Sequence, residues 1–224
     1  MRKNNNIILI RYSKCASSFL HRHFSNQFDI LGTQSQFHPD VSDYEEMVAG
    51  PTCLTGYDLN YWRTVSSIRH PIERFFSALY FSNAMYVGRQ NDSNWKEDEW
   101  FGLPIEVQLS RFLETGTLSG QIHELHTCTP GTYTMHSELL HGMDLLFFQE
   151  NMSAGIQEIK SRWNITISDG VPSSIASSKD AYLDVFEVDC SEEKSFLRNK
   201  YYMALEEIFS EDIKLYESLY SKNV

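Results

Sequence analysis

Apolar positions along the chain form short runs that alternate with segments of helical spacing. The runs over residues 6–12, 64–68 and 143–148 predict buried strands, because they are short, contain apolar residues and are followed by turn or helix signals. Apolar residues at helical spacing predict helices over 17–28, 71–86, 104–114, 153–163 and 191–220. Strands that alternate with helices are typical of an α/β protein whose parallel sheet is covered by helices on both faces. We expect a single domain over residues 1–224.

Composition narrows the class of protein further. The chain carries 19 basic and 30 acidic residues, a net charge of −11, which argues against nucleic acid as a partner. Its four cysteines form no C-x-x-C pair, so free thiols are expected. No apolar run approaches the ~20 residues that span a bilayer, and the N-terminal run IILI is too short for a signal peptide. We therefore expect a cytoplasmic protein, or one of the Golgi lumen only if an anchor was removed.

The segment IILIRYSKCASSFLHRHF, residues 7–24, predicts a strand, a turn and the start of a helix. A helix N-terminus attracts anions because its first amide groups are unpaired and its dipole is positive there. Lys14 adds a mobile positive charge, and the hydroxyls of Ser17 and Ser18 add hydrogen-bond donors. The alternative is a capping serine beside a surface lysine, because the glycines of a Walker-type loop are missing.

The segment SSIRHPIERFFSALYF, residues 66–81, ends a second buried strand at Arg69 and starts a helix at Pro71. Arg69 is a permanently charged planar donor suited to a terminal phosphate, and Ser77 follows it by about two helical turns. The alternative is a structural ion pair between Arg69 and a neighbour such as Glu73. Ligands of parallel sheets bind beyond the carboxyl ends of the strands, so both segments are expected to face one crevice.

These two segments resemble the motifs of the 3'-phosphoadenosine 5'-phosphosulfate (PAPS)-dependent sulfotransferases, closest to the carbohydrate, Golgi-type members. The first family motif, Pro-Lys-[Thr/Cys]-[Gly/Ala]-[Ser/Thr]-[Ser/Thr], is matched by Ser13-Lys14-Cys15-Ala16-Ser17-Ser18. The second, Arg-Asp-Pro-x-x-Arg-x-x-Ser-x-x-[Tyr/Phe], is matched over residues 69–80, with His70 in place of the aspartate. Weaker similarity extends to the segments around His126, Glu150, and Asp212 with Tyr216.

The resemblance implies a three-layer P-loop-like fold and transfer of a sulfuryl group from PAPS to an acceptor hydroxyl, without a metal. Lys14 would stabilise the charge that grows on the leaving phosphate, and Arg69 with Ser77 would bind the 3'-phosphate. The 5'-phosphate would be held by the first segment, with the cofactor-binding residues Lys14, Cys15, Ala16, Ser17, Ser18 and Phe19. In relatives the general base lies between the two motifs, where His38 of QFHPD is the first candidate, before Glu45 and Asp58.

The acceptor is expected to be a small molecule or a saccharide, neutral or cationic, because the acidic chain would repel a polyanion. Trp95, Trp100 and Phe101 mark a loop that either stacks on a sugar or is anchored to the body of the protein. The spacing His123-x-x-His126-x-Cys128 is looser than that of compact zinc sites, so no metal is expected. Two alternatives stay open, a P-loop-like nucleotide or small-molecule kinase and a catalytically silent protein that binds 3'-phosphoadenosine 5'-phosphate (PAP).

Overall fold

The computed structural model describes residues 7–10, 12, 15, 20, 30–31, 63–89, 103–116, 128–163 and 191–223. Four strands lie in this part of the chain: β1 (Ile7–Ile10), β2 (Ile30–Leu31), β3 (Arg63–Ile68) and β4 (Leu145–Phe148). The α-helices are α4 (Pro71–Arg89), α5 (Ile105–Thr115), α7 (Ser137–His141), α8 (Met152–Trp163), α10 (Ser191–Ile208) and α11 (Ser210–Asn223). Two 3-10 turns, η4 (Thr134–His136) and η5 (Gln149–Asn151), complete the set.

The strands form one parallel sheet in the order β2-β1-β3-β4. The predicted α/β class is therefore confirmed. β3 is central and its last five residues are buried, as predicted, although only Val65 and Ile68 among them are apolar. Two buried hydroxyls of this strand are hydrogen-bonded: that of Thr64 donates to the Asp144 carboxylate at 3.0 Å, and that of Ser66 donates to the Ile10 carbonyl at 2.9 Å. The sheet thus buries hydroxyls without leaving these two groups unsatisfied.

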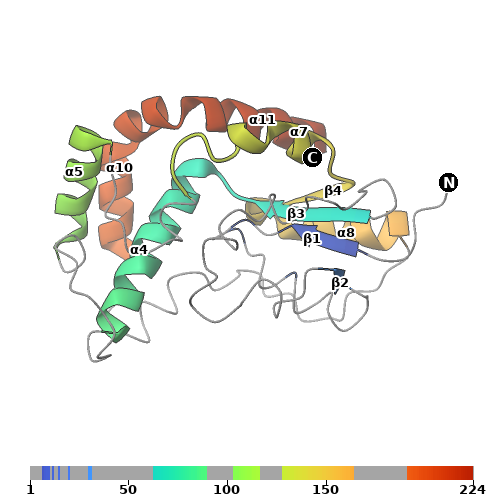
Figure 1. Ribbon diagram of the computed structural model, residues 1–224, viewed down its shortest axis with the longest axis horizontal. Coiled ribbons are helices and arrows are strands. Elements are labelled where there is room, and N and C mark those ends of the chain that lie inside the picture. Colours follow the sequence, from blue (N-terminus) through green and yellow to red (C-terminus); the bar gives the residue numbers. More distant parts are fainter. Residues whose placement is uncertain are drawn as a thin grey trace.

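Helices contact both faces of the sheet (Figure 1). On one face, Leu140 of α7 and Tyr216 of α11 pack in a cluster with Ile68 and Phe148. On the other face, α8 follows β4 and its Gly155 lies directly against the ring of Phe147. Phe147 and Phe148 are neighbours in the strand, and alternation along the strand sends their rings to opposite faces.

A second apolar cluster joins α4, α5 and α10 at the end of the molecule toward which the chain leaves β3 (Figure 1). Phe75 of α4 stacks on Phe112 of α5, with ring centroids 4.9 Å apart. Asn83 and Gln108 exchange side-chain hydrogen bonds between the same two helices, at 2.7 and 3.2 Å. The helix predicted after Pro71 thus forms the link between the sheet and this helical cluster.

The single helix predicted over 191–220 is corrected by the structure, which divides it at Phe209 into α10 and α11. Helical hydrogen bonds cross the division, from the N–H of Phe209 to Leu205 and from that of Ile213 to Phe209. In Figure 1 the two helices run in different directions. The bend lets the completely buried Phe209 ring enter the helical cluster while α11 turns onto the sheet.

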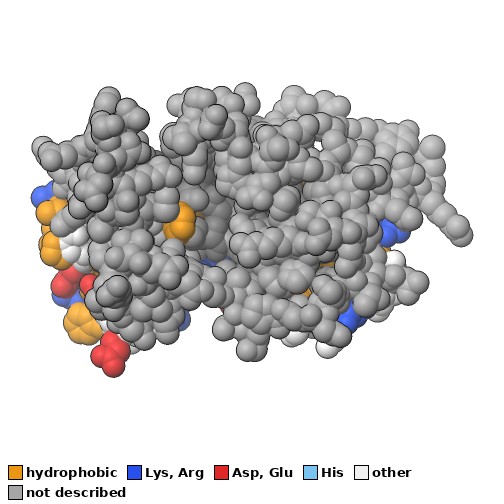
Figure 2. Space-filling view, turned by 90° about the horizontal axis from the view of Figure 1, so that it is seen from below, with side chains coloured by type: hydrophobic (Ala, Val, Ile, Leu, Met, Phe, Trp, Pro, Cys, Tyr) orange, Lys and Arg blue, Asp and Glu red, His pale blue; other side chains and the backbone are white. Residues whose placement is uncertain are grey.

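The outer face of α10 is partly apolar. Phe196 and Met203, two turns apart, are 61% and 75% exposed, whereas Leu197 and Leu205 of the same helix are buried. Figure 2 shows hydrophobic and charged side chains together at the end of the molecule that carries α5 and α10. Of the helices in the described segments, none combines the length and apolar composition needed to cross a bilayer.

Replacing Gly155 by alanine is expected to destabilise the fold by about 1–3 kcal/mol, the usual cost of overpacking. A Cβ at this position would overlap the Phe147 ring, which is itself completely buried. Helix propensity alone predicts the opposite sign, because alanine is favoured over glycine within helices by about 1 kcal/mol. Urea unfolding of Gly155→Ala measures which effect prevails.

Gln157→Ala on the exposed side of α8 is the matched control, with an expected change within about 0.5 kcal/mol. A Gly155→Ala variant at least as stable as the wild type would contradict the tight contact between α8 and β4.

Candidate functional site

The candidate site lies at the carboxyl edge of the sheet, where the turns after β1, β3 and β4 meet. Cys15 follows β1, Arg69 and His70 follow β3, and Glu150 follows β4. Because parallel strands end at the same edge, residues far apart in sequence are brought together here. Cys15 and the backbone of Arg69 lie close together, because both contact the Tyr133 hydroxyl, and the crevice expected between the two segments stays a prediction.

The hydroxyl of Tyr133 connects these two motifs. It donates a hydrogen bond to the Arg69 carbonyl at 2.9 Å and accepts one from the Arg69 N–H at 3.1 Å. The same oxygen lies 3.3 Å from the Sγ of Cys15. A phenol has one proton, and it is used on the Arg69 carbonyl, so the thiol is the donor in the third contact. One buried oxygen thus joins the turn after β1 to the turn after β3.

The Tyr133 side chain is fixed from two directions. The next residue, Thr134, donates its backbone N–H and its hydroxyl to Asp212 of α11, at 2.9 and 2.7 Å. The guanidinium of Arg74, from the buried first turns of α4, lies over the Tyr133 ring at 4.9 Å and over the Tyr12 ring at 5.7 Å. Aromatic faces stabilise a desolvated cation, so these rings help to offset the burial of Arg74.

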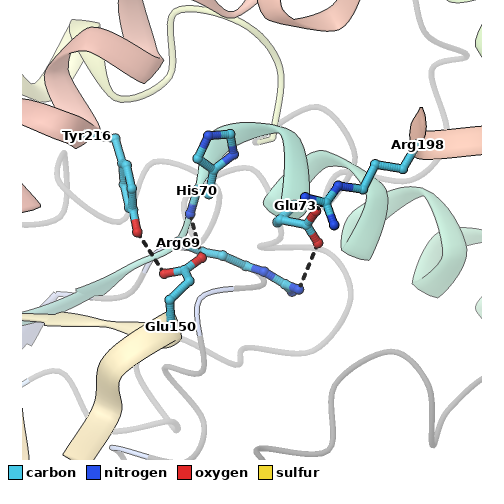
Figure 3. Close-up of polar contacts among 6 residues, drawn as sticks. All are labelled: Arg69, His70, Glu73, Glu150, Arg198 and Tyr216. Carbon is cyan, nitrogen blue, oxygen red and sulfur yellow. Dashed lines mark hydrogen bonds and ion pairs between the residues drawn. The ribbon is translucent and has the colours of Figure 1, made fainter. Parts of the chain in front are cut away.

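Glu150 ties the turn after β4 to the turn after β3 and to α11 (Figure 3). One carboxylate oxygen accepts from the His70 N–H at 2.9 Å, and the other accepts from the Tyr216 hydroxyl at 2.8 Å. The rings of His70 and Tyr216 meet edge to face, with centroids 5.5 Å apart. Both oxygens of this carboxylate are thus used on neutral donors.

Arg69 is a cation with a spare donor group. Its side chain is only 11% exposed, and among the described residues its NH1 group has no hydrogen-bond partner. The predicted pair with Glu73 exists, but its N···O distance is 3.7 Å, whereas Arg198 approaches the other oxygen of Glu73 at 2.8 Å (Figure 3). The ion pair with Glu73, the structural alternative for Arg69, is therefore long, and Arg198 lies closer to the same carboxylate.

Burial sets the protonation states around the site. It raises the pKa of the Cys15 thiol and raises that of the Tyr133 phenol well above its ordinary value. Both groups are therefore protonated near neutral pH, and Cys15 acts as a hydrogen-bond donor and not as a thiolate nucleophile. Burial also lowers the pKa of the His70 imidazole, against the opposing influence of Glu150. His70 is accordingly neutral near pH 7.

The other predicted site residues divide into two groups. Ser77 lies in α4 with a completely buried side chain, so a phosphate reaches it only if the surrounding side chains move. The remaining predicted residues lie outside the described part of the chain: Lys14, Ala16, Ser17, Ser18, Phe19 and His38, with Glu45 and Asp58.

Sequence reasoning missed Tyr133 and Arg74 as parts of the site. Tyr133 lies 64 residues from Arg69 along the chain, and no motif marks it. Arg74 stands in the second motif, but only the fold reveals that it is buried between two tyrosine rings. Glu150, Asp212 and Tyr216, which lie in the segments of weaker similarity to the family, form hydrogen bonds that brace this edge of the sheet.

Within the described residues, no group of three or more His, Cys, Asp or Glu side chains is placed to hold a metal ion. His123 and His126 lie outside those residues. No protein-family model, no curated protein and no solved structure matches the chain. The site is therefore interpreted from its own geometry and from the motifs in the sequence.

The lowered pKa of His70 predicts that the folded protein loses stability in acid. Because burial lowers its pKa from 6.5, the unfolded chain binds the proton more tightly than the folded chain does. The contribution of His70 to stability is therefore complete above the unfolded pKa and is lost as the pH falls below 6.5 toward the folded pKa. Thermal melts across this range should show a smaller acid-induced drop for His70→Gln than for the wild type.

His141→Gln, at an exposed histidine of α7, serves as the control and should lose stability in acid as the wild type does. If His70→Gln followed the wild-type curve as well, the acid sensitivity would arise from other groups.

Proposed function

We propose that the chain is a PAPS-dependent sulfotransferase of three-layer, P-loop-like fold that transfers a sulfuryl group to an acceptor hydroxyl. The observation that carries the proposal is Arg69, a largely buried guanidinium at the carboxyl edge of the sheet with a donor group that has no partner among the described residues. A buried cation with spare donors is suited to an anion. Its position at the end of a parallel strand is where nucleotide ligands of such sheets bind.

The 3'-phosphate of PAPS is the anion proposed for Arg69. The pair with Glu73 is long at 3.7 Å, and Arg198 lies within 2.8 Å of the same carboxylate. A phosphate dianion would therefore displace a weak contact, and Arg198 would keep Glu73 neutralised. Ser77 is the second proposed ligand of this phosphate, and its burial requires local adjustment of α4 when the nucleotide binds.

The 5'-phosphosulfate is assigned to the first motif, in which Lys14 precedes Cys15 and two serines follow it. Ser17 and Ser18 would hold the 5'-phosphate, and Lys14 would stabilise the negative charge on the leaving oxygen during in-line displacement. Cys15 takes part through its hydrogen bond to Tyr133. The motif thus needs its small residues for backbone approach and its lysine for charge.

The acceptor is proposed to be the hydroxyl of a saccharide or of a small alcohol. His38 is the proposed general base, since a neutral imidazole can take the hydroxyl proton as sulfur is attacked. The resemblance to sulfotransferase motifs supports the class of reaction, and the net charge of −11 favours an acceptor that is not a polyanion.

Lys14→Ala is expected to abolish sulfate transfer while the protein stays folded. The lysine is assigned to charge stabilisation in the transition state, and losing such a group commonly costs about 10²–10³ in turnover. Transfer from labelled PAPS to a panel of saccharides, alcohols and amines measures the effect, and circular dichroism checks the fold. Lys160→Ala, at an exposed lysine of α8, is the control. Turnover near that of the wild type in Lys14→Ala would remove Lys14 from the mechanism.

Arg69 and Glu73 together test the 3'-phosphate assignment. Arg69→Ala should weaken binding of PAP by about 10- to 100-fold, the loss expected for a charge-assisted contact, and hardly change binding of 5'-AMP. Glu73→Gln removes the competing carboxylate and should leave PAP binding unchanged or tighter. Isothermal titration measures both ligands, with ATP as a third to detect kinase-like selectivity.

Equal losses for PAP and 5'-AMP in Arg69→Ala would instead mean that Arg69 has a structural role. A wild-type protein that preferred ATP to PAP would favour the kinase alternative.

A further inference from the structure

The Tyr133 hydroxyl contacts both motif turns at once. We propose that this hydroxyl couples the two phosphate-binding turns, so that a nucleotide carrying both phosphates binds more tightly than its separate phosphates would predict. Tyr133 is then a positioning residue that acts through Arg69 and Cys15. The ligand named here rests on the proposed function, whereas the coupling of the turns rests on the contacts alone.

The contacts fix backbone and not only side chains. Both the N–H and the C=O of Arg69 are bonded to the Tyr133 hydroxyl, at 3.1 and 2.9 Å, so the peptide groups on either side of the Arg69 Cα are held. On the other turn, the Cys15 Sγ lies 3.3 Å from the same oxygen, and Lys14 is the preceding residue. Movement of either turn therefore strains a bond to the oxygen that holds the other.

The hydroxyl is separable from the ring. The Tyr133 ring is 1% exposed, lies under Arg74 and meets the Tyr12 ring at a centroid distance of 5.5 Å. Phenylalanine at this position keeps the ring contacts and removes only the oxygen. Thr134 remains bonded to Asp212, so the segment that carries residue 133 stays attached to α11.

Holding two subsites in register favours ligands that use both. When two contact points are fixed relative to one another, the second contact forms without a further loss of freedom, and the bivalent ligand gains affinity. When one point becomes free to move, the bivalent ligand loses this gain while each single contact is nearly unchanged. Tyr133→Phe should therefore weaken the binding of a nucleotide that carries both phosphates more than the binding of a nucleotide that carries one.

The test compares Tyr133→Phe with Tyr201→Phe. Tyr201 is the matched control because its hydroxyl also joins two elements, here α10 to α5, through contacts at 3.1 Å to the Ser110 hydroxyl and 3.3 Å to Glu106. Isothermal titration with PAP, 5'-AMP and 3'-AMP measures binding. Tyr133→Phe should weaken PAP about tenfold and each monophosphate by less than about threefold, in line with the net worth of one hydrogen bond. Tyr201→Phe should change none of the three.

A second readout needs no nucleotide. Cys15 is completely buried, and its thiol donates to the Tyr133 oxygen, so loss of that oxygen should expose the thiol to a small alkylating reagent. Peptide mapping by mass spectrometry measures the rate of alkylation without added nucleotide. Cys15 should be alkylated at least tenfold faster in Tyr133→Phe than in the wild type or in Tyr201→Phe.

The outcomes separate the two proposals. If the wild type binds none of the nucleotides, the proposed function fails, and faster alkylation of Cys15 in Tyr133→Phe still supports the coupling of the turns. If the wild type binds PAP and Tyr133→Phe weakens all three nucleotides alike, or none, the coupling is overturned. Unchanged alkylation of Cys15 in Tyr133→Phe also overturns it.

Discussion

The turn after β3 depends on the pair of hydrogen bonds between the Tyr133 hydroxyl and the backbone of Arg69, at 2.9 and 3.1 Å. A strand that ends in the interior leaves an N–H and a C=O that cost free energy if unpaired, and here one side chain satisfies both. Tyr133 is in turn held through Thr134 by Asp212 of α11. Three segments that are remote in sequence are thus joined at one point, and the position of the Arg69 guanidinium follows from it.

Among the described residues at this edge, the charges are divided so that the Arg69 cation remains available. Arg74 is buried against two tyrosine rings, and Arg198 lies close to Glu73. Both carboxylate oxygens of Glu150 accept hydrogen bonds from neutral donors. Arg69 therefore keeps a donor group without a partner among the described residues, although the chain as a whole carries a net charge of −11. Net charge limits which large partners approach, but the local arrangement decides what binds.

The sequence predicts the sheet and its edge better than it predicts how that edge is braced. Short runs that contain apolar residues predict β3 and β4 to within about two residues, and the run LLFF of β4 is typical of a buried parallel strand. The bend at Phe209 was missed, since helical spacing continues through it and no proline or glycine marks it. In hindsight Ser210, followed by two acidic residues, is a typical helix start. The role of Tyr133 cannot be predicted from the sequence for a different reason, because it depends entirely on contacts that the fold creates.

The histidine at position 70 illustrates how a motif can change without losing its geometry. The motifs that this segment resembles have an aspartate there, yet the contact that the structure makes at this residue is a hydrogen bond from the backbone N–H to Glu150. Any residue except proline supplies that donor. An aspartate would place a third carboxylate near Glu73 and Glu150, and like charges at short range repel one another. A neutral imidazole, packed edge to face on Tyr216, avoids this repulsion while the backbone hydrogen bond is kept.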